Sequence, residues 1–218
     1  MSNPITSVAS TAADSSATRV LRNTYMLLSM TLMFSAVTAG ISMALNVPYM
    51  GLLMLLPYIG LLVMVEKTKN SAAGIGWVFA LTGWLGFSLG PVLNHYVGIS
   101  GFEPVLTALG GTAIIFLGLS AYVLVTRKDF SFATGFLTTG MLVAFVAALA
   151  NAFLHIQALA LALTCMFLFL SSGMILWQTS QIIHGGERNY ISATVTLYVM
   201  IYNLFTTLLQ LVGMGGDD

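Results

Sequence analysis

A small set of polar side chains could hydrogen-bond or react in this sequence, and most of them lie inside long apolar stretches. One row near the C-terminus has the spacing 4, 3, 4 and 3, which places its members on one side of a helix; it consists of Thr196, Met200, Asn203, Thr207 and Gln210. The preceding stretch carries Ser171, Gln178 and Gln181. Polar stripes in apolar helices face other helices or water. The pattern therefore predicts a hydrogen-bond network between helices, or else a hydrated path or ligand cavity.

Combinations of residues typical of catalysis or metal binding are scarce. Residues 98–101 match the G-x-S-G pattern of rhomboid-type intramembrane proteases, and His155 is expected on the same side of the molecule as Ser100. Ser100 lies in a predicted polar loop instead of at a helix start, which disfavours serine protease chemistry. His184 is expected on the opposite side from His95 and His155, so these three cannot share a metal ion. We therefore predict no enzyme, no metal and no cofactor.

The composition indicates a membrane protein. The chain has 218 residues, of which 58% are hydrophobic, and only seven are basic and seven acidic. About a quarter of the residues in a soluble domain are charged, so this chain cannot form an ordinary water-exposed surface. This excludes a soluble enzyme and a nucleic-acid-binding protein, which needs a basic face. Cys165 is the single cysteine, so the chain forms no intramolecular disulfide.

Seven apolar segments are long enough to cross a bilayer, which takes about 20 helical residues. They cover approximately residues 23–45, 48–65, 72–93, 104–125, 132–154, 158–183 and 191–212. We therefore predict an all-α integral membrane domain over residues 19–213, followed by a short C-terminal tail, 214–218. Residues 1–18 are rich in Ser, Thr and Ala and predict a flexible N-terminal tail. The first apolar segment is too long for the core of a cleaved signal peptide.

The basic residues predict the orientation of the chain. If the N-terminus is cytoplasmic, all seven fall in cytoplasmic regions: Arg19, Arg22, Lys67, Lys69, Arg127, Lys128 and Arg188. The opposite loops and the C-terminus carry Glu103, Asp217 and Asp218 instead. Cytoplasmic loops of membrane proteins are enriched in Lys and Arg. This distribution predicts a cytoplasmic N-terminus and a C-terminus on the other side.

Small residues recur in two of the predicted spans and predict close helix packing. The first set is Gly83, Gly86 and Gly90, and the second is Gly110, Gly111, Gly118 and Ala121. Small residues let membrane helices approach one another closely. We interpret both sets as contacts within one chain. A dimer face or a pore lining is the alternative.

Several motifs in a fixed order resemble a known family. They are residues 22–25 (RNTY), 90–94 (GPVLN), 121–129 (AYVLVTRKD), 182–187 (IIHGGE), 189–191 (NYI) and 197–205 (LYVMIYNLF). Over residues 19–212 the chain resembles the bacterial YccA-type branch of the Bax-inhibitor family of seven-span membrane proteins. The resemblance implies six helices around a central seventh, in the bacterial cytoplasmic (inner) membrane. In that membrane, the C-terminus predicted from the basic residues would be periplasmic.

The resemblance also implies a function. Proteins of this branch interact with the ATP-dependent membrane protease FtsH, restrain its degradation of other membrane proteins, and look like its substrates. The predicted N-terminal tail would then be the end that the protease engages, beginning with Ser2, Asn3, Pro4, Ile5 and Thr6. The expected partners are therefore this protease and the lipid bilayer, with no nucleic acid. Formation of a homo-oligomer is left open.

The chain departs from the family at two positions. Calcium-leak members carry one aspartate in span six and one in span seven, and this pair is thought to act as a pH-sensitive latch on a pore. The matching positions here are Gln178 and Met200, which cannot ionise or supply a carboxylate ligand. We therefore rank an ion leak, or a conduit for small solutes, below the protease-modulator interpretation.

Overall fold

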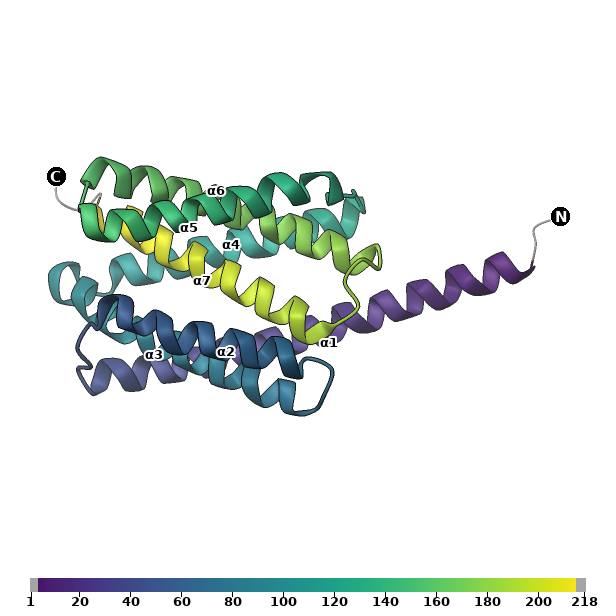
Figure 1. The fold of residues 1–218 in the computed structure, drawn as a ribbon, viewed down its shortest axis with the longest axis horizontal. Coiled ribbons are helices and arrows are strands. Elements are labelled where there is room, and N and C mark those ends of the chain that lie inside the picture. The colour runs from purple at the N-terminus through teal and green to yellow at the C-terminus, as the bar shows by residue number, and fades with distance from the viewer. Residues whose placement is uncertain (1–3, 215–218) are drawn as a thin grey trace. The chain divides into compact units, whose positions relative to one another are not determined.

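Every regular element in the described part of the chain is helical. The structure, a computed structural model, describes the backbone of residues 4–214 and the side chains of residues 16–214. Its elements are α1 (Pro4–Ala44), η1 (Gly51–Met54), α2 (Leu55–Thr68), α3 (Ala73–Ser100), α4 (Glu103–Thr126), η2 (Ser131–Ala133), α5 (Thr134–Leu154), α6 (Gln157–Ile183) and α7 (Tyr190–Met214) (Figure 1). Within the described part of the chain, seven helical segments are long and apolar enough to cross a membrane. The predicted all-α class and seven spans are confirmed.

Helix α1 is longer than the predicted first span. Its membrane-spanning part is Ser16–Ala44, but the helix begins at Pro4. Residues 4–18 are therefore helical, whereas their composition predicts no regular structure. A helix already nucleated in the membrane extends at little cost, because each further residue adds one hydrogen bond. Ser2, Asn3 and residues 215–218 lie outside the described residues.

Helix α3 continues beyond the predicted end of the third span. The polar pair Asn94-His95 indicates a loop in the sequence, yet the helix runs on to Ser100. The side chain of Asn94 explains this, because its Nδ2 donates to the carbonyl oxygen of Met43 at 3.0 Å, at the end of α1. The prediction that Ser100 lies in a polar loop is wrong. It is the last residue of α3, and Gly101 (φ 72°) ends the helix.

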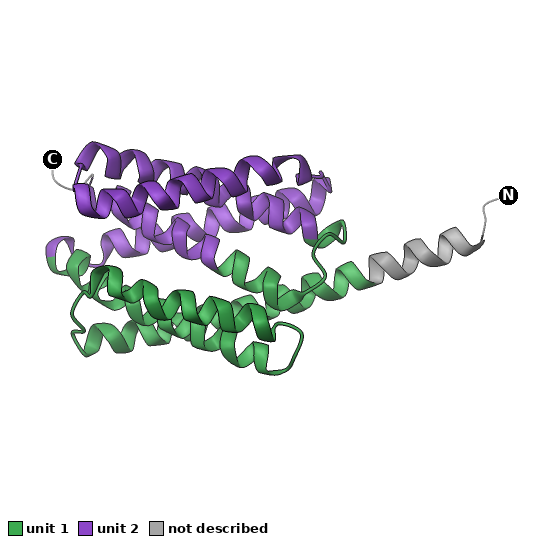
Figure 2. Cartoon of the chain, in the orientation of Figure 1, with its two compact units in different colours: residues 1–98, 182–198 green, residues 99–181, 199–218 purple. Residues whose placement is uncertain are grey.

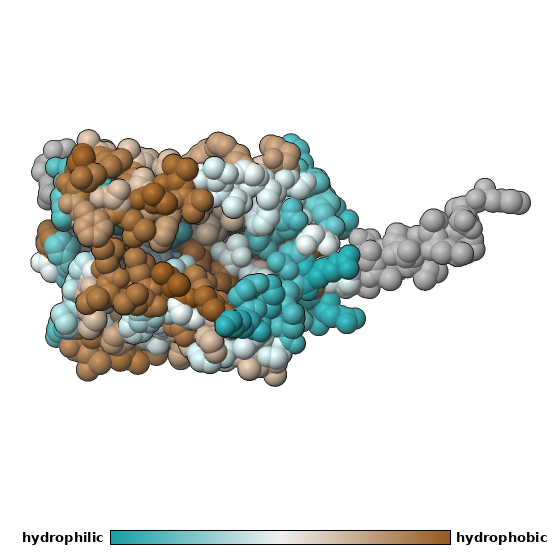
Figure 3. Space-filling model, viewed as in Figure 1, coloured by the Kyte–Doolittle hydropathy of each residue, from teal (hydrophilic) through white to brown (hydrophobic). Residues whose placement is uncertain are grey.

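The chain divides into two compact units (Figure 2). Unit 1 comprises residues 1–98 and 182–198, and therefore α1, α2, all but the end of α3, the last two residues of α6 and the beginning of α7. Unit 2 comprises residues 99–181 and 199–218, and therefore α4, α5, most of α6 and the rest of α7. In each unit the hydrophilic residues on the visible face gather toward one end of the helices (Figure 3).

Unit 1 is held together by close contact between α1 and α3. Gly83, Gly86 and Gly90 of α3 have no room for a side chain: a Cβ on Gly83 would lie 2.6 Å from the ring of Phe34, and one on Gly86 would lie 2.6 Å from Ser35 Oγ. Small residues bring membrane helices together in this way. The packing predicted for these three glycines is confirmed.

A buried tyrosine joins three helices of unit 1. The hydroxyl of Tyr198, on α7, is hydrogen-bonded to Ser35 Oγ of α1 at 2.5 Å and donates to the carbonyl oxygen of Thr82 of α3 at 3.2 Å. Tyr198 is only 1% exposed. A hydroxyl buried in an apolar environment needs such partners. The network therefore ties α7 to the α1–α3 pair.

Unit 2 contains a reciprocal contact between α5 and α6. A Cβ on Gly140 of α5 would lie 2.8 Å from Leu170 of α6, and a Cβ on Gly173 of α6 would lie 2.7 Å from Leu137 of α5. Each leucine therefore packs over a glycine of the other helix. Both leucines are buried, and together with Ala144 they form the centre of a hydrophobic cluster.

The glycines of α4 differ from those of α3. A Cβ on Gly110 or Gly118 would have nothing within 4 Å among the described residues. A Cβ on Gly111 would lie 3.3 Å from the side chain of Leu208 of α7. The close packing predicted for this set is therefore wrong for Gly110 and Gly118. Their spacing alone does not distinguish a packed face from an exposed one.

Candidate functional site

A cavity of about 300 Å³ with polar walls lies inside unit 2, between α5, α6 and α7. Its walls contain three carboxamides, three threonines and four apolar residues: Asn151, Asn203 and Gln210; Thr164, Thr206 and Thr207; Ala148, Ala160, Leu163 and Phe167. None of these side chains ionises near neutral pH. The cavity is therefore suited to uncharged groups that form hydrogen bonds.

The threonine hydroxyls of the cavity are already engaged. Thr207 Oγ1 donates to the carbonyl oxygen of Asn203 at 2.7 Å, and Thr206 Oγ1 donates to that of Tyr202 at 3.0 Å. Thr164 Oγ1 divides its hydrogen bond between the carbonyl oxygen of Ala160 at 2.9 Å and Gln210 Oε1 at 3.0 Å. Hydroxyls in apolar helices commonly bond the preceding turn in this way. They shape the cavity but have no hydrogen left to donate to a ligand.

The carboxamides, in contrast, keep free donors. Asn151 Oδ1 accepts from the backbone N–H of Ile156 at 3.0 Å, and Gln210 Oε1 accepts from Thr164. These bonds orient the two side chains and leave their NH₂ groups available. In the part of the chain that the structure describes, the carboxamide of Asn203 makes no hydrogen bond. The cavity therefore offers three carboxamides to an incoming group.

The structure brings together three residues of the predicted polar set. Asn203, Thr207 and Gln210 line the cavity, whereas Gln178, Gln181 and Met200 are not among its lining residues. Gln178 is only 2% exposed, and its Nε2 has no partner among the described residues. Met200, at the other family latch position, is buried at 6% exposure. The two positions that match the family latch therefore carry uncharged, buried side chains, and neither side chain lines the cavity.

Asn151, Thr164 and Thr206 also line the cavity, but they are not among the residues predicted from the sequence. Asn151 is twelve residues from the preceding polar residue of its segment, Thr139, so no periodic row marks it. One signal was present: Thr164 precedes Ser171 and Gln178 by seven and fourteen residues, which places all three on one face of a helix. All three are buried in the structure.

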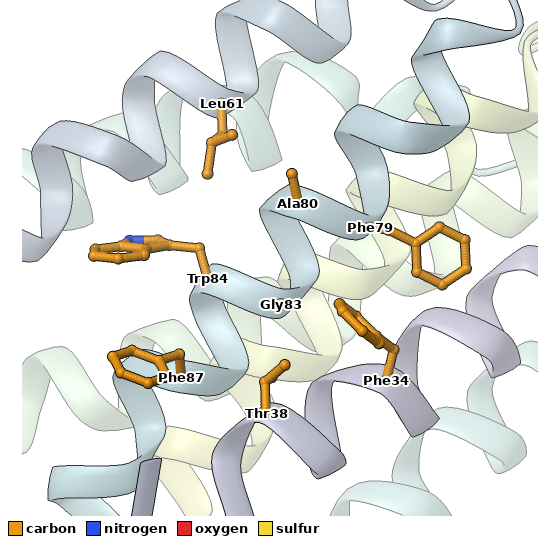
Figure 4. Close-up of a pocket in the computed structure, with 8 residues that line it drawn as sticks. All are labelled: Phe34, Thr38, Leu61, Phe79, Ala80, Gly83, Trp84 and Phe87. Carbon is orange, nitrogen blue, oxygen red and sulfur yellow. The ribbon is translucent and has the colours of Figure 1, made fainter. Parts of the chain in front are cut away.

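Unit 1 contains a second recess, which is apolar. It has a volume of about 490 Å³ and is lined by Phe34, Thr38, Leu61, Phe79, Ala80, Gly83, Trp84 and Phe87 of α1, α2 and α3 (Figure 4). The indole N–H of Trp84 already donates to the carbonyl oxygen of Met54 at 3.1 Å, and Thr38 Oγ1 donates to that of Ser35. The recess therefore suits hydrocarbon and offers no catalytic group.

The predicted cytoplasmic loops lie near the ends of α6 and α7. In unit 1, Asn189 Nδ2 donates to the carbonyl oxygen of Lys69 at 3.0 Å, and Asn189 Oδ1 accepts from the N–H of Ile191 at 2.9 Å at the start of α7. In unit 2, Ser180 Oγ donates to the carbonyl oxygen of Lys128 at 3.3 Å. These bonds place basic loops beside the C-terminal end of α6 and the N-terminal end of α7.

Charged groups are sparse in the described residues, and no three His, Cys, Asp or Glu side chains there are grouped to hold a metal ion. A hydrogen bond with Tyr122, and the charge interaction with it, raise the pKa of Lys128 above its ordinary value. The ammonium lies 5.6 Å from the centre of the Tyr122 ring. Lys128 is therefore positively charged at physiological pH, as an orientation signal requires.

Comparison with known proteins places the chain in a family. The family model described as Inhibitor of apoptosis-promoting Bax1 (Bax1-I) matches residues 17–217. The chain is 50% identical over 201 residues to the Modulator of FtsH protease YccA of Escherichia coli K12, with 92% of each chain covered. The Inner membrane protein YccA of Escherichia coli O6:H1 has the same identity and coverage.

A third relative, a membrane protein of Vibrio cholerae, is 44% identical over 203 residues that cover 92% of this chain and 91% of its own. The match extends over all seven helical segments. The resemblance predicted from the separate motifs is thereby confirmed. The chain belongs to the Bax1-I family and is a close homologue of YccA, a modulator of FtsH protease and an inner membrane protein.

Proposed function

We propose that this protein binds an ATP-dependent membrane protease of the FtsH type, restrains its degradation of other membrane proteins, and catalyses no reaction itself. The observation that carries the proposal is the 50% identity, over 92% of both chains, to a protein named for modulating FtsH. The polar groups of unit 2 are consistent with it, because carboxamides and hydroxyls recognise partners but do not transfer protons near neutral pH.

Co-purification and substrate turnover test this proposal together. The full-length protein, extracted in a mild detergent, should retain the protease. Its overproduction should lengthen the half-life of a membrane-protein substrate of the protease. A soluble substrate of the same protease is the control that separates restraint on membrane substrates from general inhibition. Failure to retain the protease, together with an unchanged half-life of the membrane substrate, would contradict the proposal.

We further propose that the N-terminus is cytoplasmic and the C-terminus periplasmic. The proposal is supported by the basic loops beside the ends of α6 and α7, and by the persistent charge of Lys128. In a Cys165→Ser background, Asp217→Cys should react with a membrane-impermeant thiol reagent added to intact cells. Lys128→Cys should react only after the membrane is opened, and the reverse result would overturn the orientation.

The N-terminal segment is, in this proposal, the end by which the protease engages the protein as a substrate. Helix α1 extends from the membrane-spanning part back to Pro4, so a cytoplasmic N-terminus would lie within reach of the protease. Deleting residues 2–18 should lengthen the half-life of the protein itself while leaving co-purification intact. Unchanged turnover would exclude this segment as the site of engagement.

The proposed arrangement of the spans is six helices around α7. Its support is burial: half of the spanning window of α7 is buried, as is half of that of α3, against 6% for α2. The polar row of α7 also needs polar neighbours, which lipid does not provide. Disulfide trapping between cysteines placed on α7 and on each of the other spans tests it, and cross-links restricted to one neighbour would count against a central α7.

A further inference from the structure

The three carboxamides of the unit 2 cavity lie at different distances from the ends of their helices. Asn151 is three residues from the end of α5, Gln210 is four residues from the end of α7, and Asn203 is eleven residues from that end. At 1.5 Å per residue these separations are about 5, 6 and 16 Å. Since the hydrocarbon core is about 30 Å thick and α5 has 21 residues, all three carboxamides lie within or beside hydrocarbon.

Free N–H groups in hydrocarbon need a partner that offers an acceptor oxygen. Acyl chains supply none, and an unsatisfied amide there is costly. Among the described residues, the threonine hydroxyls of the cavity donate to backbone carbonyls and to Gln210 Oε1, and none accepts a hydrogen bond from a carboxamide N–H. Two of the carboxamides are held in place through their oxygens, so their N–H groups stay directed toward a partner.

The cavity also has the form that a neighbouring helix requires. Ala148 of α5 and Ala160 of α6 form part of its wall, and such small residues let the backbone of another helix come close. A volume of about 300 Å³ corresponds to roughly ten water molecules, which leaves room for side chains that enter from outside. No charged side chain lines the cavity, so a charged partner group would be poorly compensated.

We propose that this cavity is the docking site for a transmembrane helix of the protease, whose Ser, Thr, Asn or Gln side chain accepts hydrogen bonds from Asn203 and Gln210. The inference rests on the proposed function, because that function supplies a membrane-bound partner. Hydrogen bonds between membrane helices are directional, so they would fix the position of the protease helix against α5 and α7.

Two kinds of substitution test the site in the full-length protein. Asn203→Leu and Gln210→Leu replace carboxamides by apolar side chains, and Ala160→Phe fills the cavity without removing the carboxamides. Each substitution should lower the fraction of co-purified protease about three- to tenfold. The Leu variants lose one or two hydrogen bonds to the protease helix, and the Phe variant prevents that helix from reaching the carboxamides. Gln157→Leu is the matched control, since Gln157 is exposed at the start of α6 and does not line the cavity.

Folding is followed separately, by monodisperse elution and an unchanged unfolding midpoint of each variant. If the wild-type protein retains the protease and all three variants retain it equally, the docking site is overturned while the proposed function stands. If the wild-type protein retains no protease, the proposed function itself fails. If Ala160→Phe retains the protease while the Leu variants lose it, no helix enters the cavity and the inference is also overturned.

A chemical probe distinguishes the protease from water as the occupant. In a Cys165→Ser background, Asn203→Cys should react with a small water-soluble thiol reagent when the protease is absent. Its reaction should slow at least fivefold when the protease is bound. Equal reaction rates in both states would show that water fills the cavity throughout, and would overturn the docking site.

Discussion

Gly86→Ala would add one methyl group at a very close contact between α1 and α3. The new Cβ would lie 2.6 Å from Ser35 Oγ, and closer still to the carbonyl oxygen of Ser35 and to Thr38 Oγ1. Ordinary van der Waals contact begins at 3.4 Å, so the two helices would have to separate by about 1 Å. The obstacle includes backbone, which cannot rotate away as the end of a flexible side chain can.

The expected cost has two parts. Overpacking of a well-packed interior costs about 1–3 kcal/mol. Separation of α1 from α3 also stretches the bond of Tyr198 to Ser35, which contributes about 0.5–1.5 kcal/mol. This cost is partly offset, because alanine stabilises a helix by about 0.8–1 kcal/mol relative to glycine. Gly86→Ala should therefore destabilise unit 1 by about 1–3 kcal/mol.

Gly76→Ala is the matched control, because Gly76 lies on the same helix and has nothing within 4 Å of a Cβ position. The Gly76→Ala variant should therefore gain the helix stabilisation that alanine provides, with no steric clash. The two variants should thus differ by about 2–4 kcal/mol when unfolded by a denaturing detergent or by heat in the same micelles. Equal unfolding midpoints for Gly86→Ala and Gly76→Ala would refute the packing argument for α1 and α3.

Three further changes test other parts of the structure. Asn189→Ala removes the cap of α7 and the bond to the Lys69 loop, and should lower the free energy of unfolding by about 2 kcal/mol in the same assay, whereas Gln157→Ala should leave it unchanged. Tyr198→Phe removes only a hydroxyl and should cost about 1 kcal/mol; a more stable variant would show that the Ser35 and Thr82 bonds contribute nothing. In liposomes, Ca²⁺ flux through the protein should not change between about pH 6 and 8, because Gln178 and Met200 carry no proton that titrates there. A flux that rises or falls steeply across that range would contradict the loss of the latch.

The sequence predicts the class and the number of spans well, because hydrocarbon thickness sets the length of an apolar helix almost independently of packing. Except in the first and third spans, the observed span ends lie within about three residues of the predicted ones, when η1 is counted with α2. The exception in α3 shows what local polarity cannot reveal: Asn94 resembles a loop residue until its bond to Met43 of α1 is known.

The candidate site was predictable only where polar residues repeat. Asn203, Thr207 and Gln210 follow a helical period, so their common face could be recognised. Asn151 joins them through the fold alone, because α5 and α6 are connected by a very short turn. The glycines of α4 illustrate the converse, since a periodic small face there has no close neighbour at Gly110 or Gly118.

The reciprocal contact of Leu137 and Leu170 has a mechanical consequence. Each leucine occupies the space above a glycine of the other helix, so α5 and α6 cannot slide along one another without expelling both. We expect the two helices to move as a rigid hairpin that resists displacement along its axis. If such a protein is pulled from one end in a force measurement, α5 and α6 should leave the bilayer together in a single step, and Gly140→Leu should divide that step in two.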